Sequence, residues 1–280
     1  MHYKFEFLTA VKRLNSSKGA NLESLAVSPD GTIYVVNTNQ DQIIAIDKQG
    51  RQSTFATFDG KTTISSKKVV VPTVTNMTVL PNGTVVCVSV ARNQIIGINP
   101  DGNLYLIAGG EIRGVQDGNV SEAKFIFPFS VTSTYDGKIV LIDAFMLRTI
   151  DTDHNVDTMF TFQENIRPRR VIIADGEIVV SNFKGQIFQK KDDLKMLHDC
   201  EYRRSKPTPM ACVRDKIFFV NRETGALHAL DRTKTRLTQK DMPIGPKKIG
   251  RIHDVASYPD GSLILVDSNG NVWKMKLRES

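Results

Sequence analysis

The chain has few of the residues that secreted mini-proteins and membrane proteins depend on. Its 280 residues include three cysteines, one tryptophan and five histidines. No apolar run approaches the roughly 18 residues that a transmembrane helix needs. The cysteines are odd in number and lack the spacing of metal ligands, which argues against a disulfide scaffold and suits a reducing compartment. We therefore expect a cytoplasmic protein with no membrane partner.

The sequence patterns of common enzymes are also missing. We find no G-x-S-x-G nucleophile motif, no phosphate-binding loop, and no pair of histidines with the spacing of zinc ligands. These absences predict that the chain has no catalytic residues, no bound metal and no cofactor. They leave recognition of another molecule as the expected role.

What the sequence does contain is a β-rich unit repeated six times. Each copy joins a short apolar segment, a tight turn and a second segment rich in β-branched residues, as in LAVSPDGTIYVVN from Leu25. The turn positions are Gly31, Gly83, Gly137, Gly176, Lys216 and Gly261, and successive spacings are 52, 54, 39, 40 and 45 residues. A β-only repeat of roughly 40–50 residues is typical of a β-propeller. We predict an all-β fold: one six-bladed propeller domain, residues 1–280, with four-stranded antiparallel blades.

The repeat also predicts how the ring closes. The expected blades cover approximately residues 22–58, 74–109, 127–162, 169–200, 209–240 and 251–280. The last of these has room for only three strands, whereas residues 3–12 alternate like a strand. We expect residues 3–12 to complete the last blade, which would remove the open sheet edges of an unclosed ring. The expected state is a monomer.

The formal charge of +7 suggests an acidic partner. In a propeller, the loops between blades share one rim with the loops joining the second and third strands of each blade; we call this rim the top face. Phe129, Phe145, Phe183 and Tyr202 lie near it, where they could stack the bases of single-stranded RNA or pack between blades. The predicted ligand-binding residues of the top face are Arg92, Arg148, Arg167, Arg169, Arg170, Lys184, Arg203, Arg204, Lys206, Arg222, Lys247, Lys248 and Arg251.

Three interpretations of these cations remain open. They could bind the phosphates of RNA, because arginine offers paired donors to such groups. They could instead contact an acidic protein surface, or they could simply be solvated in loops. We expect a non-catalytic recognition module whose partner is single-stranded RNA or a protein.

The region between the second and third copies resembles the NHL repeat. It contains paired glycines, an Asp-Gly turn and an Ala-x-Phe-x-x-Pro segment before the next inner strand. The resemblance is good in copies one to three and six, and degenerate in copies four and five, where Asp215-Lys216 replaces the Asp-Gly turn. It implies a six-bladed propeller, and NHL propellers include RNA-binding and protein-binding domains that use the top face. The matching residues are Gly109, Gly110, Gly114, Asp117, Gly118, Ala123, Phe125, Pro128, Gly137, Asp143 and Ile150.

A more distant resemblance supplies an enzymatic alternative. The segment LESLAV resembles the ESPVW motif of gluconolactonase (regucalcin-like) propellers, which implies a calcium-dependent lactonase or esterase with Glu23 as a ligand in the central channel. Calcium takes about six to eight oxygen ligands. This alternative is the weaker one, because the equivalent positions of the other copies are Thr75, Phe129, Pro168 (Arg169 with a gap), Thr208 (Pro209 with a gap) and His253. The residues expected near the channel are Glu23, Asn76, Phe129, His253 and Asp254.

Overall fold

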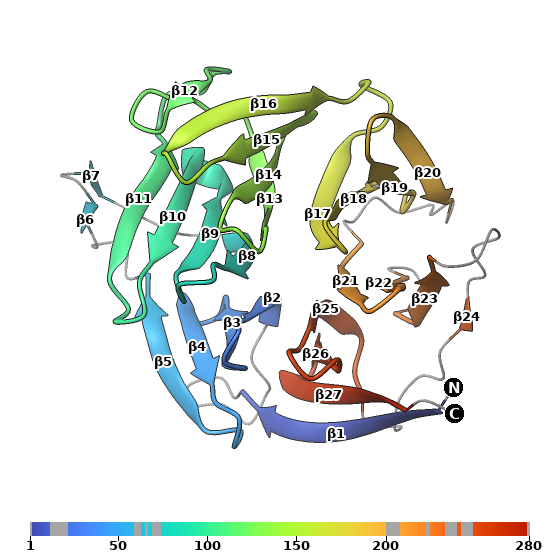
Figure 1. Ribbon diagram of the computed structural model, residues 1–280. Coiled ribbons are helices and arrows are strands. Elements are labelled where there is room, and N and C mark those ends of the chain that lie inside the picture. The colour runs from blue at the N-terminus through green and yellow to red at the C-terminus, as the bar shows by residue number, and fades with distance from the viewer. Residues whose placement is uncertain are drawn as a thin grey trace.

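The chain forms a ring of antiparallel sheets around a central axis (Figure 1). The computed structural model describes residues 2–11, 22–58, 63–64, 67–68, 74–199, 208–221, 225–232, 240–241 and 249–278. The prediction of an all-β, six-bladed propeller is confirmed. A search of these ranges for a membrane-spanning helix finds none.

Each blade contributes four strands to its sheet, ordered from the axis outward. Blade 1 contains β2 (Leu22–Val27), β3 (Ile33–Asn37), β4 (Gln42–Ile46) and β5 (Gln52–Thr57). Blade 2 contains β8 (Val74–Val79), β9 (Val85–Ser89), β10 (Gln94–Ile98) and β11 (Leu104–Gly109), with the turn η1 (Val90–Arg92) after β9. Blade 3 contains β13 (Pro128–Ser133), β14 (Ile139–Asp143), β15 (Met146–Ile150) and β16 (Asn155–Thr161), and β12 (Gly118–Asn119) pairs with β16.

The second half of the ring repeats the pattern. Blade 4 contains β17 (Pro168–Ala174), β18 (Glu177–Asn182), β19 (Ile187–Lys190) and β20 (Leu194–His198). Blade 5 contains β21 (Met210–Val213), β22 (Lys216–Val220), β23 (Leu227–Asp231) and β24 (Lys240–Asp241). Blade 6 contains β25 (Ile252–Ser257), β26 (Leu263–Asp267), β27 (Asn271–Arg278) and β1 (His2–Ala10). A separate two-stranded sheet joins β6 (Thr63–Ile64) to β7 (Lys67–Lys68).

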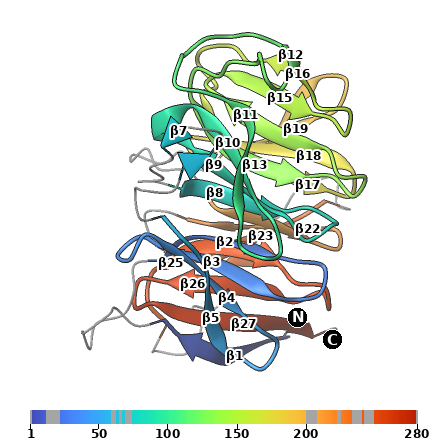
Figure 2. The same ribbon diagram turned by 90° about the vertical axis from the view of Figure 1, so that its left-hand side faces the viewer.

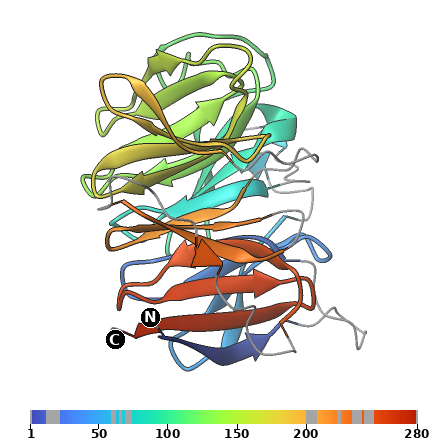
Figure 3. The same cartoon turned by 90° about the vertical axis from the view of Figure 1, so that its right-hand side faces the viewer.

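The N-terminal strand closes the ring, as predicted. β1 runs antiparallel to β27, with Phe5 opposite Met275, and the two strands lie side by side (Figures 1 and 3). Phe7 packs edge-on against Trp273 of β27, with 5.3 Å between the ring centroids. Phe5 also packs on the apolar cluster that blades 5 and 6 share. β1 therefore covers an edge and adds to a core.

The hydrophobic core is divided among the blade interfaces. In the described ranges, the buried apolar side chains form six clusters, one between each pair of neighbouring blades. In β3, Val35 packs toward blade 6 whereas Val36 packs toward blade 2, because successive strand residues point to opposite faces. A strand covered on both faces is a continuous apolar run, which explains segments such as IYVV in β3. Blade 2 accordingly lies between blades 1 and 3 (Figure 2).

Tight turns join the first two strands of each blade. Gly31 and Gly137 have φ angles of 86° and 89°, a conformation that glycine adopts without strain. Blade 5 departs from the predicted pattern, in which Lys216 was the turn position. Lys216 begins β22, and the positive φ of 54° falls on Arg214. The turn is two residues long there, so the repeat alignment was shifted at this point.

We expect removal of residues 1–11 to lower the midpoint of thermal unfolding by at least about 10 °C, since 1 kcal/mol is worth roughly 2–4 °C in chains approaching this size. The physical reason is that β27 would become an open edge and the clusters beside Phe5 would lose their cover. Differential scanning calorimetry measures the effect. Addition of a synthetic peptide of residues 1–11 should restore part of the loss, and an unchanged midpoint would contradict this role for β1.

Candidate functional site

Seven of the predicted top-face cations are among the residues that the structure describes. Arg203, Arg204, Lys206, Arg222, Lys247 and Lys248 lie outside the described residues, as does Tyr202. The remaining seven divide into three that are neutralised by an acidic side chain and four that are not. This division decides which of them can meet a ligand.

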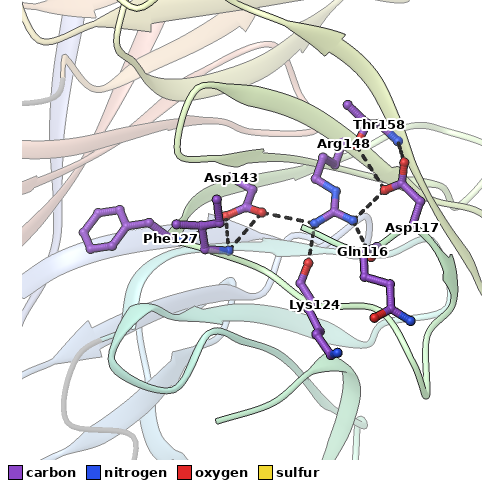
Figure 4. Close-up of polar contacts among 8 residues, drawn as sticks. Gln116, Asp117, Lys124, Phe127, Asp143, Arg148 and Thr158 are labelled. Carbon is purple, nitrogen blue, oxygen red and sulfur yellow. Dashed lines mark hydrogen bonds and ion pairs between the residues drawn. The ribbon is translucent and has the colours of Figure 1, made fainter. Parts of the chain in front are cut away.

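Arg148 does not belong to the top face, which corrects the prediction. Its side chain is fully buried, and its guanidinium donates to Asp117 Oδ1 at 2.5 Å and to Asp143 Oδ2 at 3.1 Å (Figure 4). It also donates to the carbonyl oxygens of Gln116 and Lys124 at 2.8 and 2.7 Å. Arg148 thus ties the loop before blade 3 to β14 and β15 from the inside.

Asp143 supports the same loop from the end of β14. Its carboxylate accepts hydrogen bonds from the backbone N–H groups of Ile126 and Phe127, at 3.0 and 2.6 Å (Figure 4). Asp267, at the end of β26, accepts in the same way from the N–H of Gly250 at 2.9 Å. The acidic residues that the NHL-like pattern places after the second strand therefore anchor the loops that enter their own blades.

Arg170 and Arg92 are also neutralised. Arg170 Nη2 lies 2.8 Å from Asp254 Oδ1, and the two side chains are 13% and 1% exposed. This pair links β17 to β25 near the central channel. The prediction that Arg170 is a free cation of the top face is therefore wrong. Arg92 forms a partly exposed ion pair with Glu111 at 2.6 Å.

The other four cations have no such partner. Arg167, Arg169, Lys184 and Arg251 make no ion pair with the acidic side chains of the described residues. Arg167, Lys184 and Arg251 are exposed, and Arg169 is partly buried. Arg167 precedes the inner strand β17, Arg169 is the second residue of that strand, and Lys184 follows β18 of the same blade. Three unpaired cations therefore gather at the top of blade 4.

Arg169 is held in place by aromatic rings. Its guanidinium carbon lies 3.9 Å from the ring centroid of Phe183 and 5.2 Å from that of Phe129. Phe127 is the third ring, at 5.8 Å, and it stacks on Phe129 with 6.0 Å between centroids. We call Arg167, Arg169 and Lys184 with Phe127, Phe129 and Phe183 the Arg169 cluster.

The electrostatics of the Arg169 cluster favour an anion. Burial, and then the nearby charge of Arg167, lower the pKa of the Arg169 guanidinium. Its Nη1 donates to the carbonyl oxygen of Pro168 at 3.0 Å, while its buried Nε has no hydrogen-bond partner. A cation with this lowered solvation and no counter-charge attracts a carboxylate or phosphate strongly.

Polar side chains connect the inner strands around the channel. Asp254 Oδ2 accepts from the N–H of Leu25 in the next blade at 3.0 Å. Asn76 Oδ1 accepts from the N–H of Val131 at 2.8 Å and from the hydroxyl of Ser130 at 2.9 Å. Ser130 Oγ in turn accepts from Val171 N–H at 3.1 Å. Asn76 and Asp254 therefore join blades to each other.

These contacts do not suit the calcium site of the alternative hypothesis. Asp254 is occupied by two backbone N–H groups and Arg170, and Asn76 by its own pair of donors. Glu23 is exposed, Phe129 belongs to the Arg169 cluster, and His253 Nδ1 donates to the carbonyl of Leu22 at 2.9 Å. In the described ranges, no three His, Cys, Asp or Glu side chains gather as metal ligands. The donor set that calcium requires is thus not assembled from these residues.

Cysteine chemistry finds no support in the described residues either. Burial raises the pKa of Cys87 to about 12 and that of Cys212 to about 11. Neither thiol is ionised at neutral pH, and the thiolate is the reactive form. Cys200 lies outside the described residues.

Sequence patterns missed two parts of this arrangement. Phe127 was not singled out, although its position two residues before Phe129 puts both on one side of an extended segment. The pairing of Arg170 with Asp254 joins residues 84 positions apart, and no local signal reports it. Phe145 is 40% exposed as expected for a rim residue, whereas its neighbours Met146 and Leu147 are buried.

Comparison with known structures supports the fold. The chain is similar to virginiamycin B lyase from Staphylococcus aureus, solved as a catalytically inactive variant with quinupristin, at 14% identity and a TM-score of 0.64 over 99% of this chain and all of that one. A gluconolactonase from Xanthomonas campestris matches at 12% identity and a TM-score of 0.67, over 99% of this chain and 90% of that one. The structure of a nidogen–laminin complex matches at 12% identity and 0.57, covering 80% and 79%.

These neighbours are six-bladed propeller proteins, and at such identities the likeness is one of fold. No protein-family model matches the sequence, so the NHL resemblance has no independent support beyond the propeller itself. No curated protein sequence matches either.

Replacement of Arg148 by Ala should destabilise the fold by about 3–5 kcal/mol, because it leaves Asp143 buried without its counter-charge. Chemical denaturation of the two proteins measures the difference. Arg51→Ala is the matched control, since Arg51 pairs with Asp47 on the surface and such pairs contribute about 0–1 kcal/mol. Equal losses in the two variants would contradict the role assigned to Arg148.

Charge reversal at Arg170 should lower the thermal midpoint, because Arg170→Glu sets a second carboxylate against Asp254. Arg167→Glu makes the same change in net charge at an exposed, unpaired position and should leave the midpoint within about 2 °C, as for most surface substitutions. Circular dichroism melting curves of the two variants test the difference. If the thermal midpoint of Arg170→Glu equals that of the native chain, the ion pair does not contribute to stability.

Proposed function

We propose that the protein is a non-catalytic recognition module that binds an acidic partner through its top face, with single-stranded RNA as the favoured partner. The observation that carries the proposal is the Arg169 cluster. Its central guanidinium is partly buried, contacts three phenylalanine rings and has no acidic partner among the described residues.

The cluster is suited to a phosphate or carboxylate for two reasons. The rings restrict the motion of Arg169, so little conformational entropy remains to be lost when a ligand binds. Its planar donors can form paired hydrogen bonds with such a group, and the exposed cations of Arg167 and Lys184 add to the attraction. Arg92, Arg148 and Arg170 are neutralised by acidic side chains, so they add little to this attraction.

The aromatic content favours RNA over an acidic protein surface. A guanidinium lying over a phenyl ring is a flat platform on which an unpaired base can stack, and sequence-tolerant binding of single strands combines such platforms with cations. An acidic protein surface would use the charges alone. A lactonase activity like that of the gluconolactonase neighbour would need channel ligands, and Asp254 and Asn76 are here engaged in joining blades.

The test removes the three cations of the Arg169 cluster together. Arg167→Gln/Arg169→Gln/Lys184→Gln should weaken binding of a fluorescent twelve-nucleotide uridine oligomer, measured by anisotropy. The slope of log affinity against log salt should become shallower by about two, because each phosphate contact to a single strand contributes about 0.7.

A matched control separates position from net charge. Lys48→Gln/Lys138→Gln/Lys195→Gln removes three cations at turns of the opposite rim and on the outer strand β20, and it should leave both affinity and slope unchanged. Equal weakening in both triple variants would mean that the oligomer senses only net charge. Binding of a twelve-residue polyglutamate but no RNA at low salt would assign the face to an acidic protein.

A further inference from the structure

A cavity lies on the rim opposite the top face, between blades 2 and 3. Its volume is about 660 Å³, whereas the cavity in the central channel measures about 140 Å³. Ligand pockets typically measure about 300–1,000 Å³. The cavity is bordered by the first tight turns of blades 2 and 3 and by the turn between β15 and β16. It is therefore large enough for a small molecule and separate from the Arg169 cluster.

The walls of this cavity are largely apolar, and two tyrosines belong to them. Leu80, Ile107 and Ile139 are among the apolar lining residues. The ring of Tyr105 lies against the backbone of Gly97, where an added Cβ would stand 2.4 Å from Tyr105 Cζ. Glycine at position 97 thus provides the space that this ring occupies. Tyr135, at the rim, is 99% exposed and available to a ligand.

The charge at the cavity is opposite to that of the top face. Asp136, Asp151 and His154 line it, and among the described residues no lysine or arginine does. Lys138 lies beside them, with its Nζ 3.9 Å from Asp136 Oδ2. Both side chains are at least half exposed, so this ion pair contributes little. The chain has a net charge of +7, so an acidic cavity with aromatic walls differs in sign from the protein as a whole. Solubility alone does not require such a cavity.

We propose that this cavity binds a small organic cation, an ammonium group carried on an apolar body. Tyrosine ring faces attract such cations, and carboxylates add a counter-charge at the cavity edge. The apolar body would bury against Leu80, Ile107 and Ile139, where it loses contact with water. This site is independent of the RNA-binding proposal, because it uses other residues on another rim.

The repeats themselves supply variants that remove the charge and keep the fold. Blade 2 has Asn82 at the position of Asp136, and Asn82 Oδ1 accepts from Thr84 N–H within the same kind of turn. Blade 2 has Asn99 at the position of Asp151, and both accept a backbone N–H four residues ahead, at 2.9 and 2.8 Å. Asp136→Asn/Asp151→Asn should therefore fold normally while removing both carboxylates.

The test compares phenyltrimethylammonium with its uncharged isostere tert-butylbenzene by amide NMR titration of the full chain. We expect the cation to shift signals of residues around Tyr105, Tyr135 and Asp151, and to bind at least about tenfold more tightly than the isostere. Asp136→Asn/Asp151→Asn should abolish that preference, reducing cation affinity about tenfold and leaving the isostere unaffected.

Matched variants make the result decisive. Asp192→Asn/Asp193→Asn removes two exposed charges at the corresponding turn of blade 4 and should leave cation binding unchanged. Tyr105→Leu should weaken it, with the folded state confirmed by the NMR spectrum. Shifts that map elsewhere, equal affinity for the two probes, or cation binding that survives loss of both carboxylates would overturn the proposal.

Discussion

Each blade of this protein is a sheet whose two faces must both be covered, and the rest of the structure depends on that requirement. No blade can satisfy it alone, because the side chains of one strand alternate between two neighbouring interfaces, as Val35 and Val36 do in β3. Only a closed ring covers all six sheets. Pairing of β1 with β27 supplies the closure, so residues at opposite ends of the chain share one blade.

The closed ring brings inner strands close enough to be joined by polar side chains. In five of the six blades the inner strand carries a register shift near its start, and Ser130, Arg170 and Asp254 follow such shifts directly. A bulge changes the direction of a side chain. The side-chain oxygens of Asn76, Ser130 and Asp254 thereby accept hydrogen bonds from backbone N–H groups of the next blade. In a channel enzyme, oxygen atoms at such positions would bind a metal, whereas here they join the blades.

The fold also pairs some of the arginines with acidic side chains. A net charge of +7 says little about where cations are available, because Arg148 and Arg170 are neutralised inside the fold and Arg92 at its surface. Among the described residues, unpaired cations lie at the top of blade 4 and at Arg251, and an acidic cavity lies on the opposite rim between blades 2 and 3. Two rims of opposite character are compatible with two unrelated ligands on one scaffold.

The strands, the number of blades and the closing strand could be predicted from the sequence, because they follow from local alternation and from a repeat that recurs within the chain. It placed the cations in loops, whereas Arg148 lies in β15 and Arg169 and Arg170 lie in β17. It also did not distinguish Arg148, which is fully buried, from Arg167, which is exposed. Arg170 and Arg169 are adjacent, yet one meets Asp254 across the ring and the other meets phenylalanine rings of blades 3 and 4. Tertiary packing makes this difference, because Asp254 comes from a blade far along the chain and the bulge that aims each side chain depends on the pairing of the strands.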